Sequence, residues 1–182
     1  MSQRQRTKKQ IVNLSVSAML CALGVIILSI GSLVEVADAS VAVIASLLCV
    51  YAVIEIGGIY PRLIWLVTSV VSLLLLVSQP TPVIFYALLA GYYPILKAKI
   101  ERLPVALSWL LKWVCATVGT LAVYAVSYLF VPTLLEGLHT PWLLALAYLG
   151  ILVVFLLYDV CLTMLITFYF RRLRKRLRLH KE

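Results

Sequence analysis

Charged side chains inside long apolar stretches are the residues of this sequence best placed to do chemistry. Glu55 and Asp159 each lie within an apolar run, and Lys97 and Lys112 lie near the ends of two others. If these runs cross a membrane, the charged groups must face the protein interior and find partners there, or must carry protons or ions. We favour a structural cluster, in which Glu55 or Asp159 pairs with Lys97 or Lys112 or is capped by backbone and hydroxyl groups. A proton or ion relay is the alternative.

A second group combines acids with aromatic side chains near the opposite ends of the apolar stretches. Its members are Glu35, Asp38, Tyr86, Tyr128, Trp142 and Tyr148. Acids beside aromatic rings suit a polar or cationic small molecule, through hydrogen bonds and stacking. An acidic rim repels anions, so we expect a neutral or cationic substrate here. The alternative is ordinary anchoring of Trp and Tyr at the membrane interface, beside solvated loop acids.

Catalytic and metal-binding patterns are missing from the sequence. There is no GxSxG, HExxH or P-loop motif, so we expect neither an enzyme nor a chain that hydrolyses ATP itself. The four cysteines lie in four different apolar stretches and have no metal-ligand spacing to either histidine. We therefore predict no metal and no cofactor, and cysteines that act as small hydrophobic residues.

The elements that would position these residues are six apolar stretches. Of the 182 residues, 64% are hydrophobic and 13% are charged, too little polar surface for a soluble domain. A membrane-spanning helix needs about 20 apolar residues, so six helices use almost the whole chain. We predict an all-α bundle in a single integral membrane domain with basic tails at 1–10 and 171–182. The predicted helices are 11–34, 39–59, 63–78, 81–100, 106–131 and 142–170.

The basic residues predict the orientation of this bundle. All sixteen Lys and Arg residues lie in the two tails, at position 62, or between 97 and 112. The other connections carry acids such as Glu136. Positive charge in short loops stays cytoplasmic, so both termini are expected inside. The net charge of +9 then indicates anionic lipid at the tails rather than nucleic acid. A cytosolic protein docking on the C-terminal tail is an alternative.

Two spans carry further local signals. Ser15, Ala18 and Ala22 form a stripe of small residues on the first span, which is typical of close helix packing in membranes. In the fourth span, Gly91 and Pro94 predict a kink near the cytoplasmic interface, because proline frees a carbonyl one turn earlier. The alternative is that this position is a hinge in a moving helix.

Six spans in about 180 residues, with a basic N-terminus before Ala18-Met19-Leu20-Cys21-Ala22, resemble the substrate-binding S component of an energy-coupling factor (ECF) transporter. The Gly91–Lys97 string also resembles uncharacterised bacterial membrane proteins. The resemblance implies that Ala18 and Ala22 contact a transmembrane T component, which connects to cytosolic ATPases. It also implies a small-molecule substrate, vitamin-like or another neutral or cationic solute, bound toward the outer face.

These observations lead to one preferred function and two alternatives. We expect the substrate-capture subunit of a multi-component importer in a bacterial cell membrane. A self-sufficient carrier or channel, coupled through Glu55 and Asp159, is the first alternative. A structural membrane assembly protein is the second.

Overall fold

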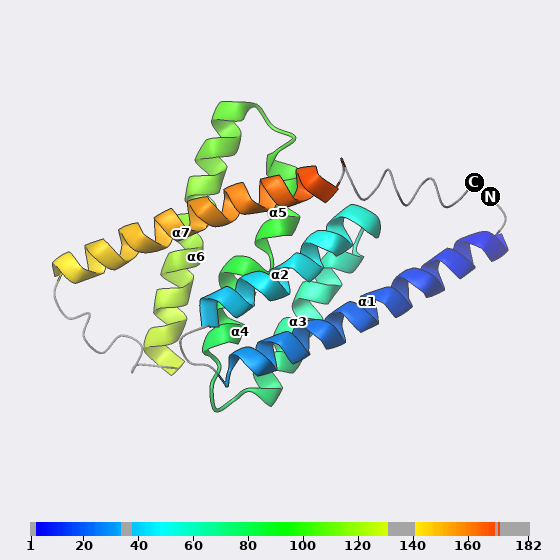
Figure 1. The fold of residues 1–182 in the computed structure, drawn as a ribbon, viewed down its shortest axis with the longest axis horizontal. Coiled ribbons are helices and arrows are strands. Elements are labelled where there is room, and N and C mark those ends of the chain that lie inside the picture. Colours follow the sequence, from blue (N-terminus) through cyan, green and yellow to red (C-terminus); the bar gives the residue numbers. More distant parts are fainter. Residues whose placement is uncertain (1–2, 34–37, 131–140, 170, 172–182) are drawn as a thin grey trace. The chain divides into compact units, whose positions relative to one another are not determined.

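The computed structural model describes residues 3–33, 38–130, 141–169 and 171, and within these residues it contains helices and no strands (Figure 1). The helices, in chain order, are α1 (Gln3–Gly31), α2 (Asp38–Glu55), α3 (Tyr60–Leu75), α4 (Thr81–Phe85), the π-helix η1 (Tyr86–Ala90), α5 (Tyr93–Ile100), α6 (Val105–Phe130) and α7 (Pro141–Phe168).

Five helical segments are long and apolar enough to cross a membrane. They are Thr7–Gly31, Asp38–Glu55, Thr81–Ile100, Val105–Leu129 and Ala145–Phe168. The sixth apolar helix, α3, has 16 residues and is the short one. At a rise of about 1.5 Å per residue it covers roughly 24 Å, less than the hydrocarbon thickness of about 30 Å. The predicted all-α fold is confirmed, and the five long helices indicate a multi-pass membrane protein.

Glycine and proline explain two differences between the predicted and observed helix bounds. α2 was predicted to reach residue 59 but ends at Glu55, because Gly57 and Gly58 both adopt positive φ, near 67° and 66°. α3 was predicted over 63–78 but spans Tyr60–Leu75. It begins early because Pro61 occupies the first helical turn, where an N–H is not needed.

Contacts divide the chain into two compact units, 1–137 and 138–182. In the first unit, α2 is central and contacts α1, α3, α4, η1 and α5. Its contact stripe consists of small side chains that are fully buried: Ala42, Ala45, Cys49 and Ala52. Small residues let helix backbones approach closely. In Figure 1, α1 (blue) accordingly runs beside α2 (cyan) and α3 (blue-green), both of which it contacts.

The fourth predicted span, 81–100, is helical but interrupted. In η1 the Gly91 N–H donates to the Tyr86 carbonyl oxygen at 2.7 Å, five residues back, and a turn at Gly91–Tyr92 follows. α5 then begins with Pro94 in its first turn. Proline cannot donate to the preceding turn, so the predicted distortion is observed as a π turn followed by a break. The hinge interpretation stays a prediction.

Candidate functional site

The small-residue face of α1, formed by Ser15, Ala18 and Ala22, is exposed. The opposite face of α1 is buried, at Leu20 and Leu28, in the core shared with α2 and α3. Packing within the first unit therefore does not use the two alanines. Exposed small residues on a membrane helix leave a shallow surface on which another helix can pack closely.

The two lysines of the predicted inner charge cluster lie beside an acid that sequence reasoning overlooked. The Lys97 ammonium lies 3.1 Å from Glu101 Oε1, and the Lys112 ammonium lies 3.6 Å from the same oxygen. Lys97 is only 1% exposed and also lies over the Tyr93 ring, 6.0 Å from its centroid. Glu101 thus provides counter-charge to α5 and α6 at once. The four-residue spacing from Lys97 to Glu101 was the available signal.

The two acids predicted for this cluster, Glu55 and Asp159, lie in α2 and α7. Glu55 is exposed at the last residue of α2, because the glycines behind it end the helix. Asp159 lies in α7, in the second unit, and its backbone carbonyl accepts a hydrogen bond from Thr163 Oγ1 at 2.9 Å. Pairing of Glu55 or Asp159 with Lys97 or Lys112 stays a prediction.

The predicted outer substrate site is described only in part. Asp38 is the first residue of α2, where a negative charge is favourable to the helix dipole. Tyr86 is 1% exposed, with its hydroxyl 3.2 Å from Cys49 Sγ, whereas Tyr128 is 65% exposed on α6. These two tyrosines therefore lie in different surroundings. The remaining members are Glu35, which lies outside the described residues, and Trp142 and Tyr148, which lie in α7.

A groove in the first unit was not anticipated from the sequence. This lateral groove has a volume of about 460 Å³ and is lined by residues of α3, the η1–α5 segment and α6. The Trp65 indole N–H donates to the Ala87 carbonyl oxygen at 3.1 Å, and the Trp65 and Tyr92 rings lie 6.3 Å apart between centroids. Arg62 and Lys99 also line it. No sequence motif predicts this groove, because it depends on the break after η1.

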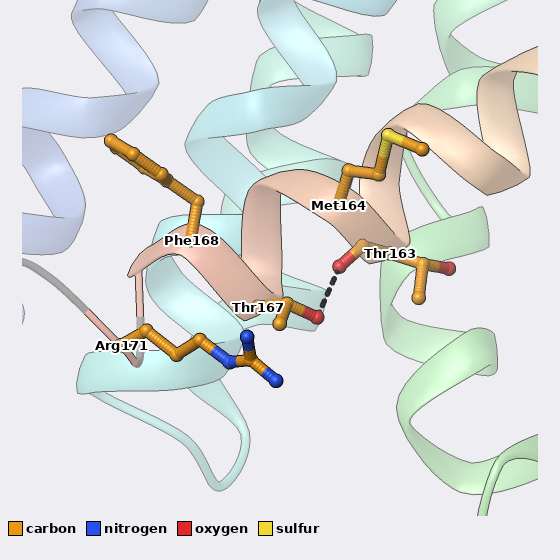
Figure 2. Close-up of a pocket in the computed structure, with 5 residues that line it drawn as sticks. All are labelled: Thr163, Met164, Thr167, Phe168 and Arg171. Carbon is orange, nitrogen blue, oxygen red and sulfur yellow. Dashed lines mark hydrogen bonds between the residues drawn. The ribbon is translucent and has the colours of Figure 1, made fainter.

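A second hollow, of about 500 Å³, lies along the end of α7 (Figure 2). The residues described around it are Thr163, Met164, Thr167, Phe168 and Arg171. The Thr167 hydroxyl donates to the Thr163 carbonyl oxygen at 2.7 Å, as the dashed line in Figure 2 shows. Both threonine hydroxyls are therefore already bonded to their own helix. These residues follow one helix and do not form an enclosed site.

No group of three or more His, Cys, Asp or Glu side chains is placed to hold a metal ion in the described part of the chain. No protein-family model, curated protein or solved structure matches this chain.

Proposed function

We propose that this chain is the substrate-capture subunit of a multi-component small-molecule importer in a bacterial plasma membrane. In this proposal it forms a six-helix bundle with both termini in the cytoplasm. It contacts a transmembrane subunit through α1, and that subunit connects to cytosolic ATPases. The substrate is a neutral or cationic solute, bound on the outer side.

The exposure of Ala18 and Ala22 carries this proposal. A helix surface that faces only lipid has no need of small side chains, whereas a helix–helix interface does. Because the buried face of α1 already packs on α2 and α3, the small-residue face is available to a second protein. The chain has no P-loop, so active import needs an ATPase from elsewhere.

The distribution of charge supports the orientation. Arg62 lies in the first turn of α3, Lys97 and Lys99 lie in the last turn of α5, and Lys112 lies in the second turn of α6. If α3 crosses the membrane, these helix ends meet at one side, and that side is cytoplasmic. Six crossings therefore require that α3 spans the membrane, although it is shorter than the five long apolar segments.

Tryptophan substitutions on α1 test the proposal. The tagged full-length chain is purified from native membranes, and co-purifying membrane subunits and P-loop ATPases are quantified by mass spectrometry. We expect Ala18→Trp and Ala22→Trp to lose both partners, because the bulky ring prevents close helix approach. Ile30→Trp is the matched control, since Ile30 is exposed on α1 but away from the small-residue face. It should retain the partners.

Two outcomes contradict the importer. If Ala18→Trp and Ala22→Trp lose the monodisperse size-exclusion peak, the alanines serve the fold of the chain itself. If no ATPase accompanies even the unmodified chain, a self-sufficient carrier or an assembly protein is favoured. Transport by the purified chain alone in liposomes, abolished by Glu55→Gln or Asp159→Asn, would identify the carrier.

A further inference from the structure

The lateral groove has charge at one end and apolar walls along the rest of its length. Arg62 lies in the first turn of α3 and Lys99 in the last turn of α5, so both cations sit at helix ends. The other lining residues include Leu88, Val118 and Ala122, which lie well inside their segments. Along the η1–α5 segment the lining runs from Lys99 back to Ala87, across the turn at Gly91–Tyr92.

Close packing between α6 and η1 forms the floor of the groove. A Cβ atom added at Gly119 would lie 2.7 Å from Leu89 Cδ2 and 3.3 Å from the Leu88 carbonyl oxygen. The helix backbones therefore approach closely at this point. On the other side, Trp65 is held in place by its hydrogen bond to the Ala87 carbonyl. The walls are largely apolar, with room between them.

Among the described residues, the two cations at the rim have no acidic partner. In the part of the chain that the structure describes, no acidic side chain lies within ion-pair distance of Arg62 or Lys99, and both side chains are exposed. Lys97 and Lys112 differ, because both lie close to Glu101. The groove therefore presents two uncompensated positive charges next to an apolar channel.

We propose that the lateral groove binds one acidic phospholipid, with its phosphate at Arg62 and Lys99 and an acyl chain along the apolar walls. Basic pockets between membrane helices on the cytoplasmic side suit anionic headgroups. An acyl chain explains the apolar walls, which a soluble anion would leave unused. The proposal depends on the membrane location of the chain and is independent of its role in import.

Binding is measured on the full-length protein in neutral detergent, by native mass spectrometry and thermal shift. The probes are phosphatidylglycerol, phosphatidylcholine with the same acyl chains, and glycerol phosphate as a soluble headgroup. We expect one phosphatidylglycerol per protein. Each of Arg62→Gln and Lys99→Gln should weaken binding about fivefold, and the double variant about 25-fold, from roughly 1 kcal/mol per cation. Arg102→Gln is the control, because Arg102 is an exposed cation nearby that does not line the groove.

A second variant separates the groove from surface charge. Ala122→Trp fills the channel without changing any charge, so it should also lose the lipid. Lys99→Gln alone remains informative if the double variant does not fold, because the Lys99 side chain is exposed. Equal binding of phosphatidylcholine, equal protection by glycerol phosphate, an equal effect of Arg102→Gln, or unchanged binding by Ala122→Trp would each overturn the proposal.

Discussion

Several polar side chains in the first unit make hydrogen bonds that the lipid could not supply. Serine and threonine hydroxyls donate to carbonyls one turn back in their own helices, as Ser69 does to Trp65 at 2.8 Å and Thr120 to Ala116 at 2.8 Å. Trp65 in turn donates its indole N–H to a different segment, at Ala87. In a π turn the hydrogen bonds shift by one residue, so this carbonyl lacks the Gly91 donor that an α-helix would give it.

Removing this indole donor should destabilise the chain. In Trp65→Phe the Ala87 carbonyl loses its partner, at a cost of about 1–3 kcal/mol for a partly buried acceptor. Trp113→Phe makes the same change on the exposed face of α6 and should have little effect. Thermal unfolding in detergent measures both variants. Equal melting temperatures for the two would mean that the indole bond contributes nothing.

The sequence anticipated some individual residues and not others, for physical reasons. The four-residue spacing of Ala18 and Ala22 predicted the small-residue stripe. The structure adds that both side chains are exposed. Glu101 was overlooked because it lies in a connection beside Arg102, where charged residues are usually solvated. Tyr86 was assigned to a substrate site, and its burial against Cys49 had no signal in the sequence.

At the scale of the helices, the apolar composition predicted which segments are helical better than it predicted where each helix begins and ends. The apolar runs predicted the helical segments, because the membrane requires all backbone groups to be bonded within the segment. The ends of α2 and α3 moved by several residues, since the Gly57-Gly58 pair and Pro61 act more locally than a hydropathy average. The π turn had no local signal beyond Gly91 and Pro94.

Two glycines should respond oppositely to alanine. In Gly31→Ala the new Cβ would lie 2.5 Å from Val41 Cγ1 and 2.8 Å from Val41 Cβ, and this branched side chain has little freedom to move. We expect a loss of about 1–3 kcal/mol from overpacking between α1 and α2. A Cβ at Gly150, in α7, meets no atom within 4 Å. Gly150→Ala should be neutral or stabilise by up to about 1 kcal/mol through helix propensity.

The melting temperatures of Gly31→Ala and Gly150→Ala, measured under one set of conditions, test this prediction. Because the chemical change is the same in both, intrinsic propensity alone predicts shifts of equal sign. A stabilised Gly31→Ala variant would show that the α1–α2 contact adjusts without cost.

For the whole molecule, the sequence predicted class and charge asymmetry but not assembly. The central position of α2 could not be inferred, because the other spans also carry small residues and apolar faces. Which helices are neighbours depends on the close approach of particular pairs, such as Gly24 on α1 and Thr68 on α3, where an added Cβ would lie 2.9 Å from Thr68 Cγ2. The lateral groove follows from such approaches.

Labelling of single cysteines tests the proposed topology of the whole chain. In a background with the four native cysteines replaced, cysteine is introduced at Asp38, Gln79 or Arg102, and sealed cells are treated with an impermeant maleimide. We expect Asp38→Cys and Gln79→Cys to react, and Arg102→Cys to react only after permeabilisation, because positive loops stay cytoplasmic.

Gln79 is the deciding position, since it follows the 16-residue α3. If α3 stays on the cytoplasmic side, Gln79→Cys is protected, the next span ends outside and Arg102→Cys reacts in sealed cells. That reversal would leave five crossings and place Arg62 and Lys99 at opposite faces, which contradicts both the six-helix bundle and the lipid site.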